Sequence, residues 1–446
     1  MNDGRVRCPA VLVAAPASGQ GKTTVAAAMA RLHGRAGRRV RAFKCGPDFL
    51  DPFWLATASG APVDALDLWM TGEADCAARL RAAAADADLL VVEGAMGLFD
   101  GTPSAADIAA RFELPVLAVI DAQAMAGTFG ALAFGLKHYR PELPWAGVLA
   151  NRVATERHAG MLQAGLRDAG DWLGALPRGA AWALPERHLG LVADLPQADA
   201  LARLDAAADA LAATPLGRLD SAGLQRWSVD FGAADTAPVT ALPPLLRGRR
   251  IAVARDAAFC FLYGANLDCL RSLGAETVFF SPLADAPLPD CDAVWLPGGY
   301  PELHLPALAA ARTTRAGLAA HIAAGRPVWA ECGGMMALMD TIVDAAGAAH
   351  RAWGLLPGTV TMQRRLAALG PQRLELPAGT LRGHTFHYST ADTPLAAVAR
   401  TARPEAPVAA DAGEALYRQG PVQASYFHAW FPSSPQATAA LFGGAP

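Results

Sequence analysis

Short strand-like segments recur along the first 195 residues, and each is followed by a stretch with helical periodicity. They lie at residues 11–15, 38–44, 88–94, 115–120 and 145–150. Most are continuously apolar, which is typical of strands buried on both faces of a parallel sheet. Strands that alternate with helical patterns predict an α/β fold with a doubly wound parallel sheet.

The pattern changes near residue 195. Residues 199–213 form an alanine-rich helical pattern, and the polar stretch that ends at residue 246 becomes proline-rich. Strand-like segments return at residues 250–254, 277–280 and 292–296. The sequence therefore predicts a first α/β domain over residues 1–195, a helical and proline-rich linker region over 196–247, and a second α/β domain over 248–446.

Length and composition narrow the class of protein. A chain of 446 residues is too long for one ordinary core at about 150 residues per domain. The formal net charge of −3 gives no electrostatic argument for nucleic acid or an anionic membrane as a partner. The N-terminus is polar and no run approaches the ~18 apolar residues of a spanning helix, so we expect a cytoplasmic protein. The seven cysteines lack C-x-x-C spacing and predict neither a disulfide framework nor a zinc site.

The segment AAPASGQGKTT, residues 14–24, lies between a predicted strand and a predicted helix. In such a loop backbone N–H groups face phosphates at the positive end of the helix, Lys22 would reach the outer phosphates, and the Thr23 hydroxyl could bind Mg²⁺. Pro16 replaces the first glycine of the usual pattern, so this is a variant loop, and a turn without nucleotide is the alternative. The predicted nucleotide contacts are Ser18, Gly19, Gly21, Lys22, Thr23 and Thr24.

Three acidic residues follow predicted strands of the first domain, namely Asp48, Glu93 and Asp100. The carboxyl ends of parallel strands meet at the edge of the sheet where ligands bind, so we predict catalytic roles for all three. Thr23, Asp48 and Glu93 are the predicted ligands of Mg²⁺. The alternatives are an Asx turn at Asp48, and helix caps or solvated loop charges for the group.

Asn151 follows the segment at residues 145–150, where a nucleotide base could lie. We interpret it as an adenine contact, with a plain turn residue as the alternative. No N-K-x-D guanine signature occurs there, so the sequence favours ATP over GTP as the co-substrate.

Residues 325–335, GRPVWAECGGM, have the layout of a nucleophile elbow: a strand, one reactive residue, and small residues where a helix begins. The glycines relieve crowding at the turn, and a helix N-terminus favours the thiolate. Cys332 is therefore predicted to be an exposed, partly activated nucleophile. The N–H of Gly333 and donors from the loop that contains Gly299 would form its oxyanion hole.

A cysteine nucleophile of this kind needs a base, and His384, His387 and His428 are the candidates. The sequence does not choose among them, because the base is near the cysteine in space rather than along the chain. His428 lacks an acid two residues later. As the base it would work in a dyad or take an orienting partner from elsewhere.

Together these motifs resemble the cobyrinic acid a,c-diamide synthase family, glutamine-dependent amidases of cobalamin biosynthesis. The resemblance covers essentially the whole chain and rests on A-P-x-S-G-x-G-K-T-T at 15–24, K-x-G-P-D-F at 44–49, V-E-G-x-M-G-L at 92–98, P-E-R-H-L-G-L at 185–191, L-P-G-G-Y-P-E at 296–302, E-C-G-G at 331–334 and G-H-T-F-H-Y-S at 383–389. It implies a dethiobiotin-synthetase-like ATP domain fused to a class I glutaminase-like domain. It also implies Cys332 as nucleophile, His428 as its base, and Asp48, Glu93 and Asp100 at the synthetase site.

The resemblance implies amidation of the a and c carboxylates of cobyrinic acid through acyl phosphates, with one glutamine and one ATP per amide. The implied partners are a corrinoid tetrapyrrole, glutamine and ATP with Mg²⁺, and a homodimer is left open. Hydrogenobyrinic acid and nickel-sirohydrochlorin are the alternative macrocycles. The competing classes are a P-loop switch ATPase, which gives Cys332 no role, and a pigment-binding or regulatory protein with inactive sites.

Overall fold

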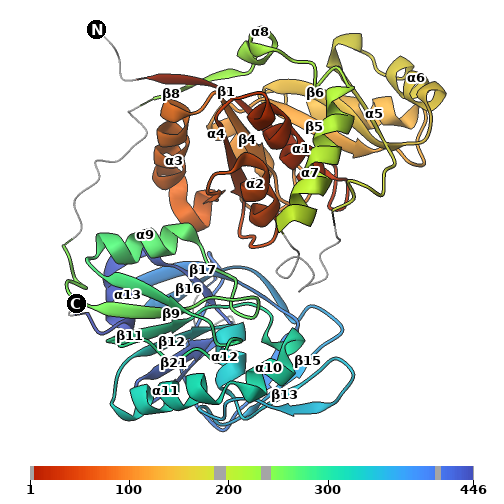
Figure 1. Cartoon of the computed structure of the whole chain (residues 1–446). Helices are drawn as coiled ribbons and strands as arrows, with labels where there is room; N and C mark the ends of the chain where they lie inside the picture. Colours follow the sequence, from red (N-terminus) through yellow and green to blue (C-terminus); the bar gives the residue numbers. More distant parts are fainter. Residues whose placement is uncertain (1–4, 185–196, 233–242, 407–412, 445–446) are drawn as a thin grey trace. The chain divides into compact units, whose positions relative to one another are not determined.

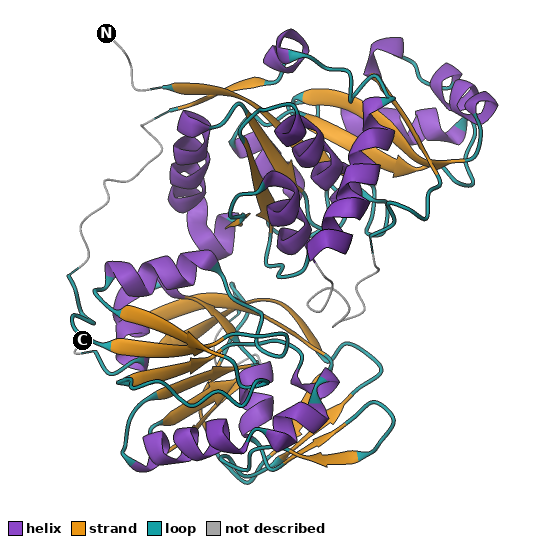
Figure 2. Cartoon of the chain, in the orientation of Figure 1, coloured by secondary structure: helices purple, strands orange, loops and turns teal. Residues whose placement is uncertain are grey.

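The computed structural model describes residues 5–184, 197–232, 243–406 and 413–444, and Figures 1 and 2 show its helices and strands. The described residues divide into two compact units, and the boundary lies between residues 232 and 243. Each unit is built on its own sheet. The motif predicted at residues 185–191 lies outside the described residues.

The first unit is built on an eight-stranded sheet of order β3-β2-β4-β1-β5-β6-β7, with β8 paired to β1. Neighbours along β3 to β7 are parallel, which confirms the predicted doubly wound α/β fold. The strands are β1 Val6–Ala14, β2 Val40–Cys45, β3 Asp64–Leu66, β4 Leu89–Glu93, β5 Val116–Asp121, β6 Trp145–Val153, β7 Trp172–Pro177 and β8 Ser228–Phe231.

Helices cover both faces of this sheet. On one face α1, α2 and α7 pack against one another (Figure 1). On the other face, alternate residues of β1 join one apolar core with residues of α3, α4 and α5. The helices are α1 Lys22–Arg35, α2 Asp51–Ser59, α3 Glu73–Asp86, α4 Ala105–Arg111, α5 Thr128–His138, α6 Glu156–Ala164, α7 Gln197–Ala212 and α8 Ser221–Gln225.

Of the predicted linker region, residues 197–232 lie in the first unit and residues 243–247 in the second. Helix α7 buries an apolar stripe at helical spacing, including Ala200, Leu204 and Leu211, and packs against α1. Strand β8 pairs antiparallel with residues 6–9 of β1, ahead of the residues that pair with β4 and β5. It thereby satisfies backbone groups of β1 that the parallel neighbours do not reach.

The second unit is also α/β. Its seven-stranded sheet has the order β10-β9-β11-β12-β21-β20-β19, with parallel pairing from β10 to β21 and antiparallel pairing beyond. The strands are β9 Arg250–Ala254, β10 Glu276–Phe280, β11 Ala293–Leu296, β12 Val328–Glu331, β19 Ala397–Arg400, β20 Ala415–Gln419 and β21 Val422–Ser425. The helices are α9 Gly264–Ser272, α10 Leu305–Ala310, α11 Arg312–Ala323, α12 Gly333–Leu338 and α13 Pro435–Leu441.

Two smaller sheets complete the second unit, and the sequence pattern did not predict them. One has the order β14-β13-β15-β18 and the other β16-β17-β22. Their strands are β13 Thr341–Val343, β14 Ala349–Arg351, β15 Thr359–Met362, β16 Ala368–Leu376, β17 Gly379–His387, β18 Ser389–Asp392 and β22 His428–Trp430. Strands β17 and β22 carry the three candidate histidines.

Candidate active sites

The predicted phosphate loop joins β1 to α1. Gly19 and Gly21 have φ values of 76° and 96°, a left-handed conformation that glycine adopts without steric cost. A Cβ atom placed on Gly21 would lie 2.2 Å from Nδ2 of Asn151. The loop therefore requires glycine at position 21 for two independent reasons.

Two side chains fix this loop from either side. The Lys22 ammonium is buried and donates to the carbonyl oxygens of Met96 at 2.6 Å and Ala17 at 3.1 Å. Nδ2 of Asn151 donates to the Gln20 carbonyl oxygen at 2.9 Å. Asn151 thus supports the loop itself, and its contact with adenine stays a prediction.

A buried ionic network lies at the carboxyl ends of two neighbouring strands, β2, which carries Lys44, and β4, which carries Glu93. Lys44 Nζ lies 2.8 Å from Oδ2 of Asp51 and 3.2 Å from Oε1 of Glu93. Thr23 donates to the same Glu93 oxygen at 2.7 Å. Burial opposes the charge of Lys44, but Asp51 and Glu93 outweigh it and raise the pKa of the ammonium. The sequence did not predict Lys44 and Asp51 as site residues.

Glu93 has an oxygen that fits a metal ligand. Burial, followed by the charge of Asp51, raises the pKa of Glu93 to about 7. Its Oε2 is buried and has no hydrogen-bond partner among the described residues, while Thr23 is bonded to Oε1. The described residues contain no cluster of three His, Cys, Asp or Glu side chains suited to a metal. Mg²⁺ does not need such a cluster, because it usually binds one or two carboxylates together with water and substrate phosphates.

The other two predicted acids also bond to nearby backbone. Oδ1 of Asp48 accepts from the N–H groups of Leu50 at 2.8 Å and Asp51 at 3.1 Å, which is the Asx turn given as the alternative. The charge of Asp48 still acts on Lys44 and Glu93. Asp100 is exposed and accepts from the Gly97 N–H at 2.9 Å. Catalytic roles for Asp48 and Asp100 stay predictions.

In the second unit, Cys332 lies between β12 and α12, as the elbow pattern predicted. Its φ and ψ are 43° and −106°, an unfavourable conformation for a residue with a side chain. The Cys332 N–H donates to the Ser425 carbonyl oxygen at 2.7 Å. A Cβ atom placed on Gly334 would lie 2.2 Å from the Leu296 carbonyl oxygen. Hydrogen bonding to the next strand and close backbone approach therefore fix the turn.

The two predicted oxyanion residues are in contact. A Cβ atom placed on Gly333 would lie 2.9 Å from both the nitrogen and the carbonyl oxygen of Gly299. The Gly333 N–H also donates a hydrogen bond that lowers the pKa of Cys332. The backbone of these glycines therefore borders the sulfur, and their role as oxyanion donors stays a prediction.

The expected exposure of Cys332 was wrong. Its residue exposure is only 4%, and burial followed by the charge of Glu302 raises the pKa of the thiol. The residue is buried because β12, α12 and the elements packed on them enclose the turn. The sequence around Cys332 indicates only the strand and the glycines, and it does not indicate which elements pack over them. Burial and the Glu302 charge therefore favour the thiol form of Cys332 over the thiolate.

Cys332 lines a small cavity together with Gly299, Glu302, Met336, Met362 and His387. The cavity volume is about 30 Å³, enough for one or two water molecules. Methionine side chains are unbranched and adaptable, so Met336 and Met362 are the part of the wall best suited to move for a larger ligand.

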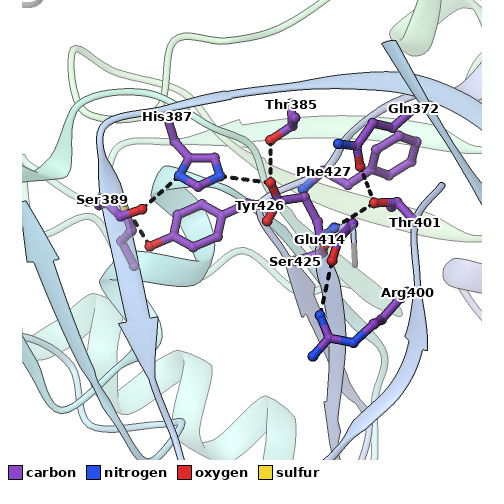
Figure 3. A network of polar contacts seen from close by, with 12 residues as sticks. Gln372, Thr385, His387, Ser389, Arg400, Thr401, Glu414, Ser425, Tyr426 and Phe427 are labelled. Atoms are coloured by element: carbon purple, nitrogen blue, oxygen red, sulfur yellow. Dashed lines mark hydrogen bonds and ion pairs between the residues drawn. The ribbon is translucent and has the colours of Figure 1, made fainter. Parts of the chain in front are cut away.

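His387 belongs to a polar network beside this cavity (Figure 3). Its Nδ1 lies 2.8 Å from the Ser389 carbonyl oxygen and its Nε2 lies 2.9 Å from Oε1 of Glu414. Thr385 donates to the same Glu414 oxygen at 2.8 Å, and the Tyr426 ring stacks on the imidazole at 3.8 Å. A carbonyl oxygen only accepts, so Nδ1 donates to Ser389, while Nε2 faces the carboxyl group of Glu414. Both ring nitrogens of His387 are therefore already engaged, which makes this residue less suited than His428 to be the base.

His384 and His428 face each other across β17 and β22, with ring centroids 4.9 Å apart. Burial lowers the pKa of His384 to about 3, and burial with the neighbouring histidines lowers the pKa of His428 well below its usual value. Both rings are therefore neutral, and a neutral imidazole can accept a proton. A Cβ atom placed on Gly298 would lie 2.3 Å from Cε1 of His428, so His428 packs against the loop that carries Gly299.

Comparisons with known proteins decide the family. Residues 11–192 match the model of the CobQ/CobB/MinD/ParA nucleotide binding domain, and residues 250–436 match that of the CobB/CobQ-like glutamine amidotransferase domain. The chain is 56% identical to a hydrogenobyrinate a,c-diamide synthase of Pseudomonas aeruginosa over 99% of both chains. It belongs to the a,c-diamide synthase family.

Two further relatives bear on the macrocycle. A hydrogenobyrinate a,c-diamide synthase of Stutzerimonas stutzeri is 57% identical over 97% of this chain and 98% of its own. A cobyrinate a,c-diamide synthase of Herminiimonas arsenicoxydans is 47% identical over 97% of this chain and 96% of its own. The comparisons confirm the predicted family and a glutamine-dependent, amide-forming ligase, and they exclude neither macrocycle.

Three features of the two sites were not predicted from the sequence. They are the Lys44–Asp51 pair, the His387–Glu414 pair and Glu302 in the wall of the Cys332 cavity. Lys44 and Glu302 do occur in the quoted motifs, which was the available signal. Within the described ranges, every helix of the synthase is too short or too polar to cross a bilayer.

Proposed function

We propose that this synthase converts the a and c carboxylates of hydrogenobyrinate to amides, using glutamine as the nitrogen donor and ATP to activate each carboxylate. The observation that carries this proposal is the match over essentially the whole chain to two hydrogenobyrinate a,c-diamide synthases. Cobyrinate is the second candidate, because a relative at 47% identity carries that name.

At the synthetase site the chain would hold ATP by the loop backbone and Lys22. Transfer of the γ-phosphoryl group to a substrate carboxylate breaks the bond to ADP and forms an acyl phosphate. Ammonia then attacks the acyl carbon, phosphate leaves, and loss of a proton gives the amide. The Lys22 ammonium would offset charge on the transferring group. Phosphate oxygens would compete with the carbonyls of Ala17 and Met96 for it.

Thr23 and Glu93 are the residues best placed to hold Mg²⁺, because the buried Oε2 of Glu93 has no hydrogen-bond partner among the described residues. Bound Mg²⁺ would supply charge neutralisation at the phosphates. Lys44 holds the Glu93 carboxylate in place through Oε1. We keep Asp48 and Asp100 as predicted acids of the same site.

At the glutaminase site the Cys332 sulfur would attack the side-chain amide carbon of glutamine, and the N–H groups of Gly299 and Gly333 would stabilise the oxyanion. His428 would take the thiol proton and give it to the departing ammonia. Water then hydrolyses the glutamyl thioester to glutamate. His428 is preferred over His387 because acceptor oxygens lie at both ring nitrogens of His387.

The test offers hydrogenobyrinic acid, cobyrinic acid and nickel-sirohydrochlorin separately to purified enzyme with glutamine, ATP and Mg²⁺. Mass spectrometry counts the amides formed. We expect two amides on hydrogenobyrinic acid, with the highest kcat/KM of the three. Faster diamide formation on cobyrinic acid or on nickel-sirohydrochlorin would contradict the assignment of the macrocycle.

A further inference from the structure

Glu302 is a buried carboxylate whose charge the structure does not balance. It lies in the short 3₁₀ turn Pro301–Leu303 that follows the Gly299 loop, and it lines the same cavity as Cys332. Its Oε2 is buried and has no hydrogen-bond partner among the described residues. A buried carboxylate without a partner is strongly unfavourable in the ionised form, so such a residue needs an explanation.

The other titratable groups that line this cavity do not supply the missing cation. They are Cys332, His387, Tyr300 and Tyr388. Cys332 and the tyrosines are neutral or anionic, and Glu414 already pairs with His387. His387 is engaged by Glu414, so a cation that pairs with an ionised Glu302 would come with the ligand of the cavity.

The ligand expected beside Cys332 carries such a cation. In glutamine the α-ammonium nitrogen lies four bonds from the amide carbon, a span of about 5 Å when extended. Glu302 and Cys332 line one cavity of about 30 Å³, so the carboxylate and the sulfur border the same small space. One glutamine molecule can therefore present its amide to the sulfur and its ammonium to the carboxylate.

We propose that Glu302 binds the α-ammonium group of glutamine in the Cys332 cavity and so selects glutamine over amides that lack this group. The proposal rests on the proposed role of Cys332 as the glutaminase nucleophile. Geometry carries it: a shared cavity and a buried carboxylate oxygen without a hydrogen-bond partner among the described residues.

Binding at Glu302 would also prepare the nucleophile. Burial raises the pKa of Glu302 to about 7, and its negative charge in turn disfavours the Cys332 thiolate. An ammonium group beside Glu302 cancels that charge, so the thiol loses its proton more readily when glutamine is bound. The enzyme would then keep its cysteine unreactive until the substrate arrives.

The test compares hydrolysis of glutamine with hydrolysis of glutaramate, which is glutamine without the α-amino group, in wild type and in Glu302→Gln. Glu302→Gln should lower kcat/KM for glutamine by about 10- to 100-fold, because it replaces a hydrogen bond between two charged groups by a weaker one. The value for glutaramate should change less than about threefold. Glu302→Asp keeps the charge and should retain part of the preference for glutamine. Glu276→Gln, an exposed glutamate of the same unit, is the matched control and should change neither value.

Two results would overturn the proposal. One is an equal loss for glutamine and glutaramate in Glu302→Gln, which is the mark of a purely structural role. The other is an unchanged preference for glutamine. Failure of the underlying glutaminase assignment looks different, because wild-type enzyme would then hydrolyse neither compound. Ammonia-dependent amidation in each variant checks that the protein has folded.

Discussion

Nε2 of His387 lies 2.9 Å from Oε1 of Glu414, and His387 lines the same cavity as Cys332. Burial, and after it the negative charges of Glu302 and Glu414, raise the pKa of the Cys332 thiol. The hydrogen-bond partner that His387 provides for Glu414 therefore bears on formation of the thiolate.

His387→Gln should lower kcat for glutamine hydrolysis by about 10- to 100-fold, because the variant removes the Nε2 partner of Glu414, whose negative charge disfavours the Cys332 thiolate. The double variant His387→Gln/Glu414→Gln also removes the Glu414 charge and should recover most of that loss. Steady-state glutamate release measures both. A double variant as slow as the single one would mean that His387 itself accepts the proton. His350→Gln, at a partly exposed pair with Asp344, is the control.

The buried ammonium of Lys44 contacts the buried carboxylates of Asp51 and Glu93, so its removal takes one positive charge from beside both. Lys44→Met should lower the free energy of unfolding by about 3–5 kcal/mol and reduce amidation, because Glu93 loses its support. Lys137→Met breaks a more exposed pair with Asp171 and should change the free energy of unfolding by less than about 1 kcal/mol. Urea unfolding measures both. Equal effects of the two substitutions would show that the Lys44 network does not stabilise the fold.

Glu331, which precedes Cys332 in the chain, should make the stability of the protein depend on pH. Burial raises its pKa to about 8, although the Trp329 indole N–H donates to it at 2.7 Å. The folded state therefore prefers the protonated acid, whose stabilisation is complete below about pH 4.5 and is lost as the pH rises toward about 8.

Glu331→Gln removes this titration. We therefore compare the free energy of unfolding of the variant with that of wild type at two pH values. The variant's advantage should be larger at pH 8 than at pH 5 by more than about 1 kcal/mol. Thermal unfolding of both proteins at the two pH values measures the difference. A stability difference that does not change with pH would contradict the raised pKa.

Gly334 allows the first turn of α12 to approach β11. Gly334→Ala places a methyl group 2.2 Å from the Leu296 carbonyl oxygen, so the backbone at Cys332 must shift. A displacement of about 1 Å at a reacting atom is enough to lower glutaminase kcat/KM by about 100-fold. Gly264→Ala, at the start of α9 with open space around it, is the control and should leave kcat/KM unchanged. Full activity of Gly334→Ala would show that this close approach does not position the cysteine.

The sequence predicted those features that a short stretch of chain determines by itself. The phosphate loop and the elbow at Cys332 are strand, glycines and helix in succession, and both appear as expected. The alanine-rich helix α7 was also recognised as a helix, but its packing on α1 depends on a long-range contact that the local pattern does not contain.

The remaining features of the sites depend on pairing between distant residues. Lys44 and Glu93 meet because β2 and β4 are neighbours, and His387 meets Glu414 across 27 residues of chain. Cys332 is buried because elements that are distant in the sequence pack around the turn between β12 and α12. Electrostatic properties such as the raised pKa of Glu302 therefore became visible only when the strands were placed side by side.

The central claim is that one chain carries an ammonia-producing site at Cys332 and an ATP-dependent amidation site at Lys22. The most direct test measures amide formation by Cys332→Ala with glutamine and, separately, with added ammonium chloride, and repeats both assays with Lys22→Ala. We predict that Cys332→Ala forms no amide from glutamine yet keeps the wild-type rate with ammonia. Lys22→Ala should form no amide from either donor while it still releases glutamate from glutamine. Loss of both activities in Cys332→Ala, in protein that is still folded, would contradict the two-site account.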